Sequence, residues 1–421
     1  MNGMTAMEAP VREEKAQRRQ AVLFGWMLAG ILGRAVLPNT IYLLTHGRPA
    51  PTVPIVIAGF PALVSSAFSL LTVVIALISL VVVRPSAARL KLVPIMWLVY
   101  LGYEVFVAAR RGPITLSTAI VSALALLTFG WLEIEPDVAA WIALRLIAAV
   151  ALLSLVLVVF KPEIAKYGDL VAAWFTRDAR LAGPFSTPNE ESDLFALGVV
   201  LAVGLWRRGN VRRPVFVPLG LALTCLVLTQ SYTAWFAAVA GAIVAISARK
   251  GGGEARRGRG IQVALVAIAV YPLSRLLLYL DSAGSLTGLS GRRLVWNYVD
   301  QNWRGARFLG HGAMAWGSLI THGALPAWAV NGHDQLLDTL YIGGIVGVTI
   351  LACTVGMMTG RAIRLWWGGT SLAFACVVLE IVRSYTEVPF EPLFGGLNLF
   401  VIAVILGLIA RHDRAPVKGA E

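Results

Sequence analysis

Hydrophobic residues in this chain form long continuous runs that are separated by short polar segments. A helix that crosses a bilayer needs about 20 mostly apolar residues, and the runs do not alternate as the strands of a membrane barrel do. The pattern therefore predicts an all-α polytopic membrane protein with about 12 transmembrane helices. The predicted spans are 21–45, 53–83, 92–109, 114–131, 138–160, 193–206, 214–230, 232–248, 261–279, 338–358, 365–384 and 388–410.

The composition supports this class of protein. Of the 421 residues, 57% are hydrophobic and only 14% are charged, whereas soluble domains carry about 25% charged residues. The mean hydropathy of +0.74 agrees. These values exclude an ordinary soluble enzyme, a disordered chain and a disulfide scaffold. The three cysteines lie in apolar runs, which predicts buried free thiols rather than a disulfide framework or a metal cluster.

The net charge of +13 is best interpreted through its distribution along the chain. With the N-terminus in the cytoplasm, about two thirds of the Lys and Arg residues between spans fall on the cytoplasmic side, as in most membrane proteins. We therefore expect a basic cytoplasmic segment at 1–20, one transmembrane domain at 21–410 and a cytoplasmic tail at 411–421. The basic character follows from this topology, so no nucleic-acid partner is expected.

Two external segments are long, at about 161–192 and 281–337, and the second carries most of the candidate chemistry. It contains His311, His322 and His333 together with four arginines and four tryptophans. Guanidinium groups bind phosphate bidentately, and histidine is suited to proton transfer near neutral pH. The segment predicts a site for an anionic, sugar-bearing ligand. In the alternative interpretation, the tryptophans and arginines are interfacial anchors and His311 is a turn residue. No HExxH or Asp-rich pair indicates a metal site.

Four ordered stretches resemble the O-antigen ligase and O-antigen polymerase superfamily of membrane glycosyltransferases. They are GPFSTPN at 183–189, QSYTAW at 230–235, SGRRLVW at 290–296 followed by LGHG at 309–312, and GHDQLL at 332–337 followed by GGIVG at 343–347. The resemblance covers about residues 90–410. Each stretch alone is a weak signal, and their order and spacing carry the comparison.

The resemblance implies a fold of the second GT-C type in the cytoplasmic membrane, with the active site on the extracytoplasmic side. The implied reaction inverts the anomeric centre and needs neither a metal ion nor a cofactor. A glycan moves from an undecaprenyl-diphosphate carrier to a glycan or glycolipid acceptor. Whether the chain is a polymerase or a ligase, and which glycan it moves, are not encoded in these motifs.

The resemblance also assigns roles to residues. Arg292 is expected to bind the diphosphate and His333 to act as the catalytic residue that accepts the acceptor proton. Because adjacent helical positions differ by about 100°, only one of Arg292 and Arg293 is expected to face the diphosphate. Further substrate-binding candidates are Trp296, Asn189 and Asp334, the last either orienting His333 or solvated. For Asn189, a loop-turning role is the alternative.

One position departs from the family pattern, because Tyr232 stands where an arginine is common. Arg145 and Arg275, both within predicted spans, are candidate replacements, since an intramembrane arginine is costly and therefore a functional candidate. A buried pair between Arg145 and Glu104 is the alternative. Glu380 and Arg383 are spaced as a structural ion pair.

A flippase or transporter of lipid-linked glycans is the competing function, because buried charges such as Arg145 and Glu104 suit a transport pathway. Such folds are often built from paired repeats with charges near the midplane, and no repeat is detected. If Arg292 and His333 meet at one outward-facing cavity, the enzyme is favoured. A central aqueous path past Arg145 would favour transport.

Overall fold

The structure is a computed structural model, and it describes residues 8–49, 57–83, 91–110, 116–168, 179–208, 213–247, 292–312, 315–326, 329, 331–393 and 396–410, with side chains from residue 14 onward. It is almost entirely helical, so the predicted all-α class is confirmed. The helices are α1 (Glu8–His46), α2 (Phe60–Val83), α3 (Leu92–Ala109), α4 (Leu116–Trp131), α5 (Pro136–Phe160), α6 (Pro162–Ala165), α7 (Pro188–Arg207), α8 (Phe216–Thr229), α9 (Tyr232–Ser247), α11 (Arg292–Asn302), α12 (Ala315–Thr321), α13 (Gln335–Trp367), α14 (Leu372–Arg383) and α15 (Gly396–Ile409).

Five of these helices are long and apolar enough to cross a membrane: α1, α2, α3, α5 and α13. Four other apolar helices, α4, α8, α9 and α15, are shorter. The chain is thus a helical protein with membrane-spanning segments, and the full number of spans stays a prediction. The predicted span 261–279 lies outside the described residues.

Two helix boundaries differ from the predicted spans. The helix predicted at 338–358 continues to Trp367, and the helix predicted at 365–384 begins only at Leu372. Gly369, with φ of +91°, lies in the turn between them. Arg361 and Arg364 interrupt the apolar run inside α13, which is why hydropathy alone placed the break too early. The second span begins at Phe60 rather than at 53, and residues 50–56 lie outside the described ranges.

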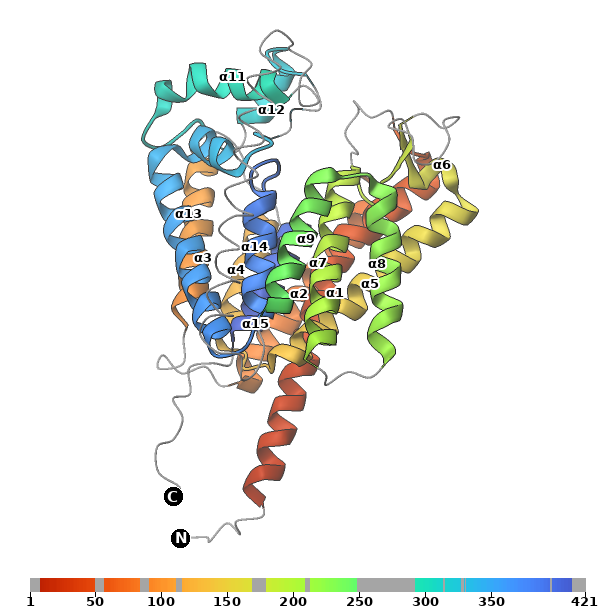
Figure 1. The fold of residues 1–421 in the computed structure, drawn as a ribbon. Helices are drawn as coiled ribbons and strands as arrows, with labels where there is room; N and C mark the ends of the chain where they lie inside the picture. The colour runs from red at the N-terminus through yellow and green to blue at the C-terminus, as the bar shows by residue number, and fades with distance from the viewer. Residues whose placement is uncertain are drawn as a thin grey trace.

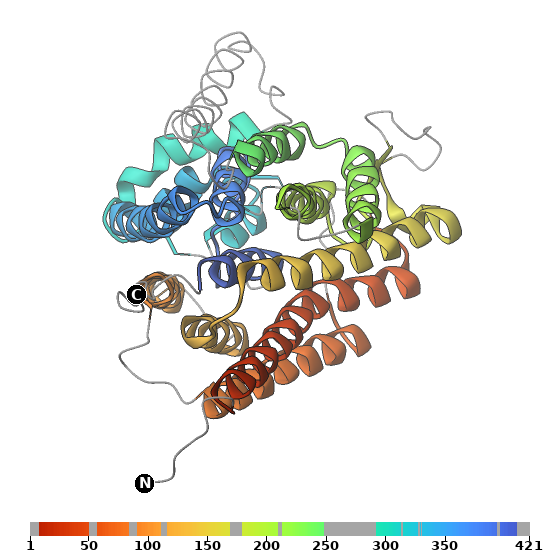
Figure 2. The same ribbon diagram turned by 60° about the horizontal axis from the view of Figure 1, so that its bottom comes forward.

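The helices form one bundle with α11 and α12 above one end (Figure 1). The start of α1 and the ends of α13 and α15 lie at the opposite end. Along one side of the bundle α1 packs against α2, and α5 lies between α1 and the group of α7 and α8 (Figure 2). Helix α15 is apolar on every face and is buried from Leu399 to Ile409, as expected for a central helix.

A kink in α13 joins the bundle to the segment above it. Gly344 has φ of +62° and ψ of −165° within the helix. The freed backbone N–H groups of Ile345 and Val346 donate to the carbonyls of Arg307 and Phe308, at 2.8 and 3.1 Å. A Cβ on Gly344 would lie 2.4 Å from the Phe308 carbonyl oxygen. The GGIVG stretch is therefore a docking point for the loop that follows α11.

Candidate functional site

Arg292 is the first residue of α11 and ties this helix to the turn after α14. One guanidinium nitrogen, Nη2, lies 2.7 Å from Oε1 of Glu387, and Nη1 donates to the Thr386 carbonyl at 2.8 Å. Both charged side chains are 16% exposed. The pair is therefore mostly shielded from water, where a charged hydrogen bond is stronger than on an open surface.

Glu387 is shared by a second partner from the other long segment. The Asn189 amide nitrogen Nδ2 donates to the same Oε1 at 2.8 Å, and Arg180 Nη2 donates to Asn189 Oδ1 at 3.1 Å. Residues from β2 (Ala179–Leu181), α7, α11 and the turn after α14 thus form one chain of polar contacts. We call Arg180, Asn189, Glu387 and Arg292 the arginine network.

Arg180 lies close to the turn before Tyr232, the position at which an arginine was expected from the sequence. Its Nε donates to the Thr229 carbonyl at 2.8 Å, directly before the turn that precedes Tyr232. Burial, together with the positive charge of Arg292, lowers the pKa of the Arg180 guanidinium. Two guanidinium groups are thus held close to each other, where they would attract an anion. Tyr232 itself is largely exposed.

The loop at 183–189 is held in place by Arg48, which follows α1. Its guanidinium donates to the carbonyls of Ile164 and Gly183, both at 2.6 Å, and to that of Phe185 at 3.0 Å. Burial lowers the pKa of Arg48 to about 10. Gly183 has φ of +44°, and a Cβ there would meet Glu191 at 2.3 Å. The glycine that opens the first motif is therefore required by close packing.

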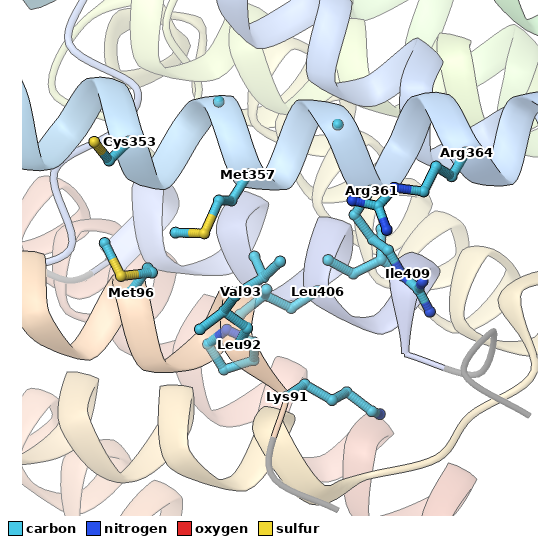
Figure 3. Close-up of a pocket in the computed structure, with 13 residues that line it drawn as sticks. Lys91, Leu92, Val93, Met96, Cys353, Met357, Arg361, Arg364, Leu406 and Ile409 are labelled. Atoms are coloured by element: carbon cyan, nitrogen blue, oxygen red, sulfur yellow. The ribbon is translucent and has the colours of Figure 1, made fainter.

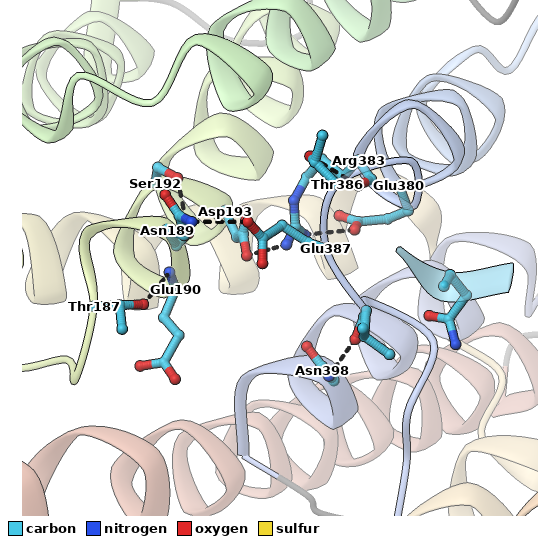
Figure 4. Close-up of polar contacts among 12 residues, drawn as sticks. Thr187, Asn189, Glu190, Ser192, Asp193, Glu380, Arg383, Thr386, Glu387 and Asn398 are labelled. Atoms are coloured by element: carbon cyan, nitrogen blue, oxygen red, sulfur yellow. Dashed lines mark hydrogen bonds and ion pairs between the residues drawn. The ribbon is translucent and has the colours of Figure 1, made fainter. Parts of the chain in front are cut away.

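A polar cavity of about 320 Å³ lies beside the arginine network. Figure 4 shows Asn189 and Asp193 of α7 directed towards Glu387 and Arg383 at the end of α14. Other lining groups come from α1, from Asn331 and from the start of α15. Several charged and amide side chains from distant parts of the chain therefore converge on one space.

At the wall of this cavity, the buried Arg383 is paired with acidic side chains. It forms ion pairs with Asp193 and, at 2.6 Å, with Glu380. The predicted structural pair of Glu380 and Arg383 is confirmed. The additional partner Asp193 joins α7 to α14, so this cluster fixes the wall of the cavity.

His333 lies in the loop that leads into α13. It adopts φ of +48°, and its backbone N–H donates to Asn331 Oδ1 at 3.0 Å. A non-glycine residue in this conformation costs about 1–3 kcal/mol and is often found at functional sites. Because Asn331 lines the polar cavity, the loop that carries His333 borders the same space as the partner of Arg292.

Trp296 and Asp334 have structural contacts rather than free functional groups. The Trp296 indole N–H donates to the Gly332 carbonyl at 3.0 Å, which fastens α11 to the His333 loop. Asp334 caps α13, since Oδ1 accepts from the N–H groups of Leu336 and Leu337 at 3.0 and 3.1 Å. An N-cap of this kind stabilises a helix by about 1 kcal/mol. Of the two alternatives given for Asp334, simple solvation does not describe this helix-capping contact, and its role towards substrate stays a prediction.

Arg145, the intramembrane arginine candidate with a described position, does not join the arginine network. Arg145 is exposed on α5, where its guanidinium lies 5.6 Å from the Trp141 ring. Glu104 is buried and accepts instead from the Leu393 N–H at 3.1 Å. The alternative of a buried pair between Arg145 and Glu104 was therefore wrong, because position 145 falls on the outer face of α5. Arg275 lies outside the described residues.

The neighbouring candidates take the following places. Arg293 is half-buried on α11 next to Arg292. His311 is a turn residue: its ring stacks on Tyr341 at 4.6 Å, and Nε2 lies 3.1 Å from the Asn302 carbonyl. His322 is exposed. Among the residues with described positions, no three His, Cys, Asp or Glu side chains are grouped for metal binding.

Sequence reasoning missed Arg180, Glu387 and Asn331. Arg180 lies between the motifs, and Glu387 lies just after a predicted span, so neither has a local pattern. The missing arginine at Tyr232 was the one available signal, since it implied a substitute from elsewhere. No protein-family model matches this chain, and a search of curated proteins finds no similar sequence.

Proposed function

We propose that this chain is a glycosyltransferase that moves a glycan from an undecaprenyl-diphosphate carrier to an acceptor sugar, without a metal ion. The proposal rests above all on the arginine network beside the polar cavity. The four stretches that resemble the O-antigen ligase and polymerase superfamily contribute to this region or contact it directly.

The geometry suits a diphosphate leaving group. Negative charge grows on the diphosphate as the glycosidic bond breaks, and fixed cations are the most effective way to stabilise it. A guanidinium has five N–H donors, and the contacts of Arg292 to Glu387 and Thr386 use only part of this set. Arg292 and Arg180 would bind phosphate oxygens with their remaining donors while Glu387 and Asn189 keep both groups oriented.

In the proposed step, an acceptor hydroxyl oxygen attacks the anomeric carbon from the side opposite the diphosphate. The new C–O bond forms as the bond to the phosphate oxygen breaks, and the anomeric configuration inverts. The hydroxyl proton passes to a His333 ring nitrogen. The undecaprenyl diphosphate leaves with the bonding electron pair, so atoms and charges balance.

The proposal includes a topology. The chain would cross the cytoplasmic membrane about 12 times, with both termini in the cytoplasm and α11 and α12 outside the cell. A cysteine at the exposed position His322, in a background without the native cysteines, should react with an impermeant thiol reagent in intact cells. A cysteine in the segment 251–260 should be shielded. The reverse pattern would place the arginine network in the cytoplasm and contradict the proposal.

Transport of a lipid-linked glycan is the second candidate function. Three carboxylic acids, Glu104, Asp338 and Glu391, lie in or beside the interface of α3 and α13, and buried carboxylates can relay protons in transporters. The space that Glu104 and Glu391 line is only about 10 Å³, less than a chain of waters needs. Arg145 lies outside it. The described residues of this interface therefore do not form an aqueous path past Arg145.

The decisive experiment is incubation of the purified full chain with an undecaprenyl-diphosphate glycan and candidate acceptors, followed by identification of the products. We expect a new glycosidic bond with inverted anomeric configuration and release of undecaprenyl diphosphate. Movement of intact carrier across proteoliposomes without bond formation would establish transport and overturn the enzyme proposal.

A further inference from the structure

A second and larger cavity lies at the other end of α13. It has a volume of about 730 Å³ and opens between the start of α3, the second half of α13 and the end of α15. Figure 3 shows Arg361 and Arg364 on the α13 side and Lys91 across from them at the start of α3. Lys91, Arg361 and Arg364 are not part of the arginine network.

The described lining of this cavity contains three cationic side chains, Lys91, Arg361 and Arg364, and no acidic one. Arg361 and Arg364 are three positions apart on α13, so they share one face of the helix. Lys91 is oriented by a hydrogen bond from Nζ to the Leu132 carbonyl at 2.9 Å. The cavity therefore offers positive charge from two different helices.

The rest of the lining is apolar. It includes Leu92, Val93, Met96, Met357, Leu406 and Ile409. Gly356 and Gly360 form a shallow strip on α13, where an added Cβ would meet nothing within 4 Å. The cavity thus combines a basic mouth with an apolar groove that is wide enough for a hydrocarbon chain.

The cavity is far from the arginine network. Arg361 follows the kink at Gly344 by 17 positions on α13, which corresponds to about 26 Å along a straight helix at 1.5 Å per residue. The end of α13 lies at the end of the bundle opposite α11 (Figure 1). This cavity is therefore too far from Arg292 to hold the diphosphate during transfer, and in the proposed topology it faces the cytoplasmic surface.

We propose that this cavity binds an anionic phospholipid, with the headgroup phosphate at Lys91, Arg361 and Arg364 and an acyl chain along Gly356 and Gly360. Basic pockets between transmembrane helices at the cytoplasmic surface bind anionic headgroups. The apolar groove disfavours a free phosphate ion as the occupant. A second copy of the chain is disfavoured as well, because two-fold pairing of this face would bring like charges together.

The test measures lipid binding to the purified full chain in zwitterionic phosphatidylcholine nanodiscs with added phosphatidylglycerol. We expect native mass spectrometry to detect a retained phosphatidylglycerol, and the thermal midpoint to rise with its mole fraction. The double variant Arg361→Gln/Arg364→Gln should bind about 30-fold more weakly, since each basic residue near anionic lipid contributes about fivefold. Arg207→Gln, an exposed arginine at the end of α7, is the matched control and should bind normally.

A second variant separates the groove from the charges. Gly356→Leu fills open space on a helix and keeps all three cations, so the protein should fold and bind phosphatidylglycerol at least tenfold more weakly. Equal binding of phosphatidylcholine, saturation by inorganic phosphate alone, or loss of a dimer in the double variant would each overturn the proposal. Because no glycan transfer is measured, these outcomes are independent of the proposed enzyme activity.

Discussion

Two groups of cations, at opposite ends of α13, are built in different ways. In the arginine network each half-buried guanidinium is held by carbonyls, an amide or a carboxylate that fix its orientation. In the cavity of about 730 Å³, here called the basic cavity, Lys91, Arg361 and Arg364 surround an open apolar groove whose described lining has no acidic residue. The orientation of the cationic groups and their total positive charge are therefore two independent properties of a site. Catalysis of a diphosphate reaction needs directed donors, whereas retention of a lipid needs net charge and apolar surface.

The largest effect on the transfer rate should come from Arg292→Ala. Loss of one directed donor to a developing anion costs about 10²–10³ in rate, and in the proposed mechanism this guanidinium would also bind the ground-state diphosphate. We expect transfer to fall about 10³-fold and carrier affinity to fall as well, measured by single-turnover rates and lipid binding. Arg292→Lys should recover only part, because it lacks the planar fork. Arg304→Ala, an exposed arginine in the same segment, should be nearly normal, and a normal Arg292→Ala would refute the role.

His333→Asn should reduce turnover by about 10², the usual scale for a lost proton-transfer residue, with carrier affinity unchanged. Asparagine tolerates positive φ, so the variant keeps the loop conformation while it removes the proton acceptor. His322→Asn is the control from an exposed position nearby. Wild-type turnover in His333→Asn would remove the catalytic assignment.

Arg180→Ala should lower transfer about tenfold, a smaller effect because Arg292 still binds the diphosphate. Addition of Tyr232→Arg should restore part of the loss, since it returns an arginine to the position where the resembling family commonly has one. The measurement is the single-turnover rate of both variants at matched thermal stability. A double variant that is no better than Arg180→Ala would argue against a shared role of the two positions.

The smallest effect should come from chelation. If guanidinium groups stabilise the leaving diphosphate, transfer should stay within about twofold in excess EDTA. Activity that is lost in EDTA and restored by Mg²⁺ or Mn²⁺ would show that the arginine network is not sufficient. Lipid retention in the basic cavity should be equally insensitive, so this measurement tests both cation groups under one condition.

Features that depend on neighbouring residues could be predicted from the sequence. Features that depend on contacts between distant residues could not. Apolar runs place most of the helices, because each must bury or expose a continuous hydrophobic surface. The break between α13 and α14 was misplaced because Arg361 and Arg364 interrupt the apolar run before Gly368 and Gly369 end the helix. Arg292 and His333 were selected through their motifs, and their roles stay predictions. Arg180 and Glu387 were not selected, since only the folded chain brings residues more than 200 positions apart into one network.

The kink at Gly344 has a mechanical consequence. The hydrogen bonds that α13 gives up at this point are transferred to the segment after α11, so two parts of the chain share one backbone ladder. The segment cannot lift as a hinged cover without exposing unpaired amides of Ile345 and Val346. Slow exchange of these two amide protons would show that α11 and the segment after it stay fixed on α13.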